Sequence, residues 1–407
     1  MGPADAQGRT SRIEVIIIAG CLIAMLTFGV RATFGLFTAP ITDEFGWGRE
    51  TFGFAMALQN LIWGVAQPIA GGFADKFGSA RVLIAGALIY FVGVAMMSGV
   101  DTPSALYLSG GLLCGIGIAA ASFAIVMASF SRSVPEEKRS WAFGIATAAS
   151  SMGQFVFAPL GQGFINAYGW QTALLLLSMF VLLVIPLAWP LRGNSGGANA
   201  RKGETSLPMG QAMSKAFGHT SYMLLIFGFF VCGFHVAFIT THMPPYLVDA
   251  GLSPSIAAWS IALVGLFNII GSFSAGVLGG THSKRLLLSG LYFSRAVAIT
   301  IFVLSPVTLT TALVFSAVMG LLWLSTIPLT AGLVAVMFGT RYMGLLWGIV
   351  FLSHQIGSFI GVWLGGRLYD TTGSYDAMWW AGAALGLFAA LVHLPIRETK
   401  ARAFEAA

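Results

Sequence analysis

The chain has 407 residues, of which 57% are hydrophobic and only 9% are charged, and its formal net charge is +6. Soluble domains are about 25% charged, so this chain cannot cover a surface that faces water. The composition argues against a soluble enzyme, a nucleic-acid-binding protein and a disordered scaffold, and it indicates a protein that crosses a membrane many times.

Apolar runs long enough to cross a bilayer, about 20 residues each, recur along the chain. We predict twelve spanning helices at approximately 13–38, 51–73, 81–100, 103–130, 141–166, 170–192, 219–248, 253–279, 285–305, 308–338, 342–369 and 376–396. The first run lacks a small-residue cleavage site after it, so we expect a retained helix rather than a cleaved signal peptide. The predicted fold class is therefore an all-α membrane protein.

The only long polar stretch, 193–218, divides six predicted helices from six others. The domains predicted from it are an N-terminal six-helix bundle (1–192), a cytoplasmic linker (193–218) and a C-terminal six-helix bundle with a short cytoplasmic tail (219–407). The two halves repeat weakly. Similar segments end at Gly46 and at Gly251, and similar loops begin at Gly71 and at Gly276; the two members of each pair are the same number of residues apart. Two six-helix repeats with a site at their interface are typical of transporters.

Most of the 21 Lys and Arg residues fall in alternate loops. Cytoplasmic loops of membrane proteins carry an excess of these residues. The distribution therefore predicts that both termini and the linker are cytoplasmic.

The loop between the second and third predicted helices reads GGFADKFGSAR, from Gly71 to Arg81. It resembles the G-x-x-x-D-[RK]-x-G-x-[RK]-[RK] loop of the major facilitator superfamily, and the twelve spans with a central linker extend this resemblance over the whole chain. The resemblance implies a cytoplasmic gate formed by Asp75, Lys76 and Arg81, although these residues can also serve only to solvate a tight turn. In the second repeat Gly280 stands where an Asp would be, so we expect a weaker gate there.

At a finer level, the chain resembles the monocarboxylate-transporter-like branch, near bacterial organic-acid permeases and oxalate–formate exchangers. The residues behind this resemblance are Gly29 to Gly35, Gly46-Trp47, Trp63-Gly64, Gln67-Pro68, Thr241 to Gly251 and Ser353 to Gly357. Many monocarboxylate transporters carry an Asp and an Arg four residues apart in helix 8 for anion binding and proton coupling, whereas this chain has Asn268 to Ser272 there. The resemblance implies a monomer in a bacterial inner membrane, but its coupling cannot simply be carried over.

Two arginines, Arg31 and Arg295, lie inside predicted spans, while no Asp or Glu lies deep in one. An arginine at mid-bilayer costs about 2.5–3.5 kcal/mol on insertion scales and is a functional candidate by default. An anionic substrate is the simplest missing partner, since a guanidinium binds a carboxylate with two hydrogen bonds. We favour Arg31, in the outer half of helix 1, because that helix lines the cavity in the superfamily; packing or snorkelling is the alternative. Arg295 is a possible second cation or a donor to carbonyls of a neighbouring helix.

His235, His242 and His354 are candidate proton carriers and substrate contacts, because histidine changes its charge near neutral pH. A buried histidine is, however, more often a packing residue. The remaining candidate substrate contacts are Asn60, Asn268, Gln355 and Trp323. Polar side chains of this kind can equally join one helix to another.

The expected function is secondary transport of a small organic anion, a monocarboxylate, by alternating access with a co-transported proton. The alternatives are exchange of one anion for another, efflux of a different small organic solute, and a transport-derived sensor. No catalytic pair, metal-ligand cluster or phosphate-binding loop appears in the sequence, and Cys21, Cys114 and Cys232 lie in apolar runs. We therefore expect no enzymatic activity, no cofactor and no metal, and the expected partners are the anion, the proton and the lipid bilayer.

Overall fold

The computed structural model describes residues 3–192, 209–339 and 343–401. Within these ranges every regular element is a helix, which confirms the predicted all-α fold. The N-terminal half contains α1 (Pro3–Ala32), η1 (Phe34–Phe37), α2 (Thr38–Phe45), α3 (Arg49–Phe77), α4 (Ser79–Met97), α5 (Pro103–Leu106), η2 (Tyr107–Leu113), α6 (Cys114–Ala120), α7 (Phe123–Ser133), α8 (Glu136–Leu182), α9 (Val184–Ala188) and η3 (Trp189–Leu191). The C-terminal half contains α10 (Met209–Phe217), α11 (Thr220–Asp249), α12 (Pro254–Thr281), α13 (Lys284–Leu304), α14 (Leu309–Leu322), α15 (Thr326–Phe338), α16 (Met343–Thr372) and α17 (Asp376–His393).

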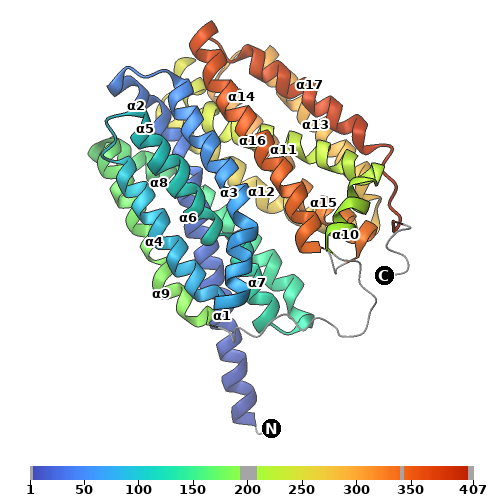
Figure 1. Ribbon diagram of the computed structural model, residues 1–407. Helices are drawn as coiled ribbons and strands as arrows, with labels where there is room; N and C mark the ends of the chain where they lie inside the picture. The colour runs from blue at the N-terminus through green and yellow to red at the C-terminus, as the bar shows by residue number, and fades with distance from the viewer. Residues whose placement is uncertain (1–2, 193–208, 340–342, 402–407) are drawn as a thin grey trace.

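Ten stretches of the described chain are long and apolar enough to cross a membrane. One of them, Trp141–Leu191, consists of two helices that meet at Gly169, where φ is +79°. Glycine adopts such a left-handed conformation without the penalty that a side chain brings. α3 is not one of these ten stretches, because its polar residues lower its hydropathy, but it also runs the length of the bundle (Figure 1). Twelve crossings result, in agreement with the sequence.

Some element boundaries differ from those predicted. The first helical path continues through η1 and α2 to Phe45, beyond the predicted end at residue 38. The chain breaks at Ala121–Ser122 and again at Trp323, inside the predicted fourth and tenth helices. The described part of the predicted linker contains the short helix α10.

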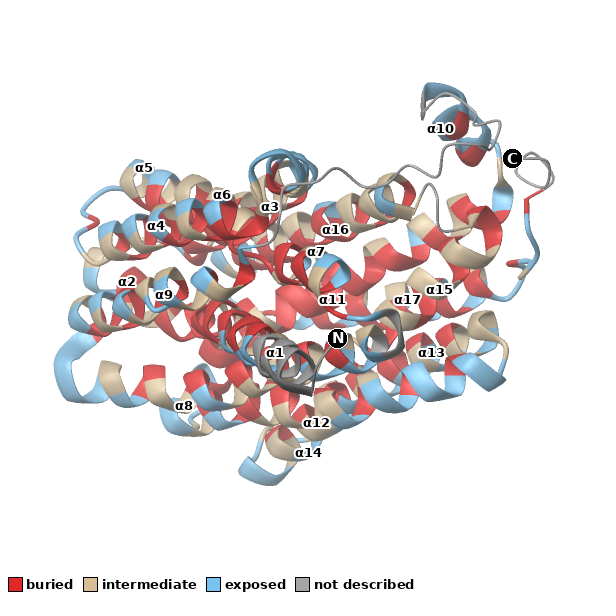
Figure 2. Ribbon diagram, turned by 90° about the horizontal axis from the view of Figure 1, so that it is seen from below, coloured by how far each residue is buried: buried red, intermediate tan, exposed pale blue. Residues whose placement is uncertain are grey.

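Two large apolar cores follow the two halves of the sequence, one built mainly from α1–α9 and the other from α10–α17. Figure 2 shows buried residues turned toward the interior of each half. Glycines bring helices together closely: Gly153 of α8 faces the Met25 carbonyl of α1, and Gly233 of α11 faces the His354 carbonyl of α16. Close backbone approach through small residues is the usual way in which membrane helices associate.

Replacing Gly233 with alanine is expected to lower the free energy of unfolding by about 1–3 kcal/mol, because the added methyl group would collide with the His354 carbonyl oxygen. The measurement is the melting temperature of the purified protein in detergent. Gly290→Ala is the matched control, because a Cβ at Gly290 has nothing within 4 Å. Equal melting temperatures for the two variants would contradict the close packing of α11 on α16.

The two halves meet at the end of the bundle opposite the chain termini, which we call the far end; the other is the terminal end (Figure 1). Gly35 faces the Thr240 carbonyl there, and Thr38 Oγ1 lies 3.4 Å from the Thr241 carbonyl oxygen. Near the terminal end, large apolar side chains of α3 and α12 are exposed, including Phe73 (52%) and Phe273 (73%). Among the described residues, the hydrogen bonds and ion pairs between the halves run from mid-bundle to the far end, so this conformation is closed at the far end.

Candidate functional site

Arg31, in the last turn of α1, is the centre of the candidate site. Its Nη2 donates a hydrogen bond to Oδ1 of Asn60 at 2.6 Å, and its guanidinium lies 4.9 Å from the ring centroid of Trp63. Its Nε is buried without a hydrogen-bond partner in the described part of the chain. Asn60 and Trp63 are three residues apart on α3 and therefore share a face of that helix. The structure thus brings together two residues named from the sequence, Arg31 and Asn60.

Trp63 is a site residue that the sequence analysis missed. Its Nε1 donates to Gln67 Oε1 (2.9 Å), and Gln67 Nε2 donates to Ser122 Oγ (3.0 Å) at the start of α7. These two bonds fix the orientation of the indole beneath the guanidinium of Arg31. The signal that could have identified it is its spacing of three residues from Asn60 on one helix.

An aromatic strip formed by Trp63, Phe351, His354 and Phe229 crosses from one half to the other. The Trp63 and Phe351 rings meet edge to face at 5.4 Å, Phe351 stacks on His354 at 5.8 Å, and His354 lies 5.0 Å from Phe229. His354 Nδ1 is buried without a hydrogen-bond partner in the described part of the protein. Of the three candidate histidines, His354 alone belongs to this strip.

The side chains of His235 and His242 form hydrogen bonds with the backbone of the C-terminal half. His235 Nε2 lies 2.8 Å from the Gly382 carbonyl oxygen of α17. His242 Nε2 lies 2.7 Å from the Val362 carbonyl oxygen of α16, and its Nδ1 lies 3.1 Å from the Tyr375 hydroxyl. These contacts hold helices of one bundle together and do not include Arg31.

Arg295, Asn268 and Trp323 come together at the break between α14 and α15. The fully buried Arg295 donates from Nε and Nη2 to the Leu322 carbonyl oxygen (3.1 and 2.6 Å) and from Nη2 to the Trp323 carbonyl oxygen. Asn268 Oδ1 accepts the Leu324 N–H at 2.9 Å. Backbone groups freed by a break in a membrane helix require such partners, so Arg295 and Asn268 support the break of the tenth crossing.

Asn268 also links the break to the other half, because its Nδ2 donates to Ser151 Oγ of α8 at 2.8 Å. Gln355 lies one turn from Phe351 on α16 and packs against Gly64 of α3. Both residues therefore lie at the interface between the bundles, on different helix pairs.

The residues of the predicted gate lie at the terminal end. Asp75 pairs with Arg132 at the end of α7 (3.1 Å), and Arg132 also donates to Ser79 Oγ. Lys76 Nζ lies 5.2 Å from the Phe77 ring, and Arg81 is exposed. These contacts stay within the N-terminal half; Arg132 was not singled out from the sequence.

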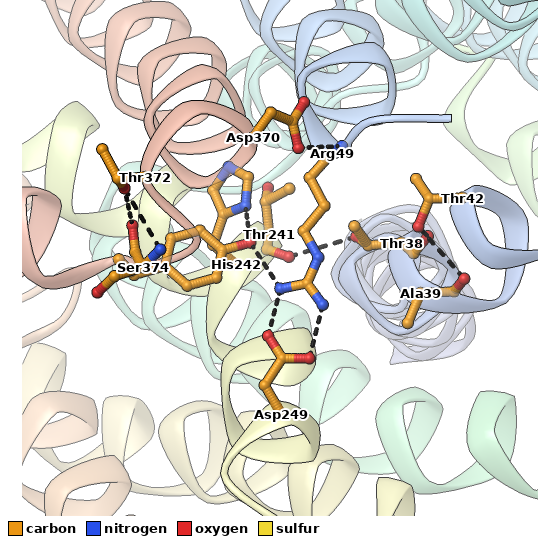
Figure 3. A network of polar contacts seen from close by, with 11 residues as sticks. Thr38, Ala39, Thr42, Arg49, Thr241, His242, Asp249, Asp370, Thr372 and Ser374 are labelled. Atoms are coloured by element: carbon orange, nitrogen blue, oxygen red, sulfur yellow. Dashed lines mark hydrogen bonds and ion pairs between the residues drawn. The ribbon is translucent and has the colours of Figure 1, made fainter. Parts of the chain in front are cut away.

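At the far end, Arg49 joins the two halves. Its Nη1 and Nη2 donate to the two carboxylate oxygens of Asp249 at 2.5 and 2.7 Å (Figure 3). The guanidinium lies 3.9 Å from the Tyr369 ring, and Nη1 donates to the Tyr375 hydroxyl at 3.2 Å. Asp370 accepts the backbone N–H of Arg49 at 2.8 Å, at the N-terminus of α3. We call Arg49, Asp249 and Asp370 the far-end bridge.

Comparisons with known proteins agree with this architecture. The profile of the family described as "Major Facilitator Superfamily" matches residues 20–362 and 249–407. "Monocarboxylate transporter 13" of Rattus norvegicus is 26% identical over 374 residues, covering 89% of this chain and 84% of the relative. The "Uncharacterized MFS-type transporter YcxA" of Bacillus subtilis (strain 168) is 27% identical over 354 residues, with 85% of each chain covered.

A solved structure described as "Crystal structure of D-xylose-proton symporter" superposes with a TM-score of 0.72 at 15% sequence identity. The superposition covers 94% of this chain and 97% of the symporter. At this identity the likeness concerns the fold alone.

Proposed function

The chain belongs to the major facilitator superfamily, and on that premise we propose that it carries a small organic monocarboxylate across the inner membrane of a bacterium. It is a multi-pass transporter rather than an enzyme, as the sequence predicted. The main support for an anionic substrate is the environment of Arg31, a cation whose contacts are the neutral Asn60 amide and the Trp63 ring.

A carboxylate is the ligand that best completes this environment. No carboxylate of the described residues forms an ion pair with Arg31, whereas Arg49 at the far end has Asp249. A guanidinium and a carboxylate form two parallel, charge-assisted hydrogen bonds, and these strengthen where water is scarce. The names of the relatives, several of them monocarboxylate transporters, support the same class of substrate.

The closed far end supports alternating access. If the basic loops mark the cytoplasm, the terminal end is cytoplasmic and this conformation faces inward. Rocking of the bundles would then break the far-end bridge and close the terminal end around the same central site. Asp75 and Arg132 at the terminal end are in the position to contribute to that closure.

For proton coupling, His354 is the candidate that the geometry favours. It lies in the aromatic strip that reaches Trp63 through Phe351, whereas Nε2 of His235 and Nε2 of His242 each contact a backbone carbonyl oxygen within the C-terminal half. The second candidate mechanism is exchange of one anion for another. It is favoured by Asn268, a neutral residue with three hydrogen bonds, in the stretch that matches, by the resemblance described above, the Asp-bearing segment of many monocarboxylate transporters.

The test of the function is a comparison of carboxylates with their neutral amides on the detergent-purified protein. A ligand that binds only the folded state raises the melting temperature, so we expect an acid to stabilise the protein and its amide to have no effect. Equal stabilisation by the amide would contradict an anion site. In vesicles, accumulation driven by an imposed pH gradient alone would support symport, whereas a requirement for anion on the opposite side would support exchange.

Replacing Arg49 with glutamine is expected to raise the population of far-end-open molecules about tenfold, because it removes a bidentate ion pair between the halves. The measurement is the distribution of distances between spin labels at the exposed positions Asp101 and Thr308, in a cysteine-free background. Asp249→Asn should act in the same way. The control Arg367→Gln removes a more exposed ion pair and should leave the distribution unchanged. An unchanged distribution for Arg49→Gln would show that the bridge does not determine the conformation.

A further inference from the structure

We propose that Gln355 selects carboxylates that carry an uncharged hydrogen-bonding substituent, such as a hydroxyl or keto oxygen near the carboxylate. This inference rests on the proposed function of Arg31. The Gln355 side chain is fully buried, and neither its Oε1 nor its Nε2 has a hydrogen-bond partner among the described residues. An amide carries two donors and an acceptor, and leaving such groups buried without partners is unfavourable.

The position of Gln355 relates it to Arg31. A Cβ added at Gly64 would lie 2.9 Å from Cβ and from Cγ of Gln355, so the side chain of Gln355 crosses α3 at Gly64. Gly64 is four residues after Asn60, and side chains at this spacing are about 5–6 Å apart on one helix face. Asn60 in turn holds Arg31 at 2.6 Å. Arg31 and Gln355 therefore approach the same two turns of α3, one from each half of the protein.

Other buried glutamines show that burial alone does not leave the amide unpaired. Gln154 Nε2 donates to the Ile261 carbonyl oxygen of the opposite half at 3.0 Å, and Gln59 Nε2 donates to the Gly110 carbonyl oxygen at 2.8 Å. Gln355 differs from both in packing on α3 at Gly64, one turn from the Asn60 that binds Arg31. An amide at this place can donate to a keto or hydroxyl oxygen and accept from a hydroxyl group, whereas a plain alkyl chain leaves it unpaired.

A structural role is the rival explanation. Gln355 has Phe351 and Phe359 one turn away on either side, and these rings pack on Trp63 and Phe54 of α3. A residue that only spaces α16 from α3 would affect every substrate equally. Selection by hydrogen bonding would change the ratio of affinities for two acids that differ in one oxygen.

The experiment measures dissociation constants from thermal-shift titrations of the purified full-length protein. The ligands are two matched sets, propionate with lactate and pyruvate, and 3-phenylpropionate with phenyllactate and phenylpyruvate. In at least one set, the wild type should bind an oxygenated acid about tenfold more tightly than its plain counterpart, the effect of one neutral hydrogen bond. Gln355→Leu should bind the plain acid within about twofold of wild type and lose the preference.

Gln154→Leu is the matched control, because it removes a buried glutamine from the same interface but from another helix pair; its preference should equal that of wild type. If Gln355→Leu does not fold, Gln355→Met provides the same apolar replacement with a more adaptable side chain. The inference is overturned if the wild type has no preference or if the Gln355 variants keep it. Failure of the proposed function gives a different result, in which no acid binds or propionamide binds as well as propionate.

Discussion

Replacing Arg31 with glutamine is expected to weaken carboxylate binding at least about 100-fold and to leave the protein folded. The substitution removes the charge and the planar fork that bind a carboxylate through two hydrogen bonds, and a factor of 100 corresponds to about 2.7 kcal/mol. The fold should tolerate it because Arg31 has a single described hydrogen bond, which a glutamine amide can also donate to Asn60. The measurement is the dissociation constant of a stabilising acid, with the melting temperature of the unliganded variant as the test of folding.

Arg31→Lys is the informative companion variant. Lysine keeps the charge but lacks the fork, so its affinity for the acid should lie between those of wild type and Arg31→Gln. Wild-type binding and transport by Arg31→Gln would show that the anchor has been assigned to the wrong residue.

Replacing Arg295 with methionine is expected to lower the free energy of unfolding by about 3 kcal/mol and to leave the affinity for the acid close to that of wild type. The reason is that the carbonyl groups of Leu322 and Trp323 would lose their charged donor inside the protein, and each buried unsatisfied group costs about 1–3 kcal/mol. The measurement is the melting temperature together with the dissociation constant of the folded fraction.

The matched control for this second variant is Arg367→Met, since the Arg367 side chain is 55% exposed and its ion pair with Glu50 should contribute little. A stable Arg295→Met protein that has lost its affinity would identify Arg295 as a ligand-binding cation rather than as a support of the helix break.

The fold was largely predictable because each crossing needs a long apolar run, and such runs are a local property of the sequence. Arg31 and Asn60 could also be singled out from the sequence as candidates, since a polar side chain inside a predicted span is unusual whichever neighbour it faces. Hydropathy could not predict that these two side chains meet, because the contact depends on where the folded bundle places α1 relative to α3.

The histidines show that helical periodicity predicts which side chains share a face of a helix but not which neighbour that face contacts. His235 and His242 are seven residues apart and share a face of α11, as the sequence indicates. Which neighbour that face contacts depends on tertiary packing, and the structure places α16 and α17 there. The far-end bridge escaped notice for the same reason, because Arg49 and Asp249 belong to different halves and no local pattern pairs them.

The hydrogen bond between Asn268 and Ser151 has a consequence for how easily the halves part. Ser151 Oγ also lies 3.3 Å from the Thr147 carbonyl oxygen of its own helix, and Asn268 retains two further bonds within the C-terminal half. Separation at this point therefore costs one hydrogen bond: Ser151 keeps its bond to Thr147 and Asn268 Oδ1 keeps both of its donors, so only Asn268 Nδ2 loses its acceptor. At the far end Asp249 is 35% exposed, so water can rehydrate the separated ions. Because few interactions are lost at these two contacts, the two conformations of the proposed alternating-access cycle are expected to lie within a few kcal/mol of each other, which would allow the carrier to reorient both empty and loaded.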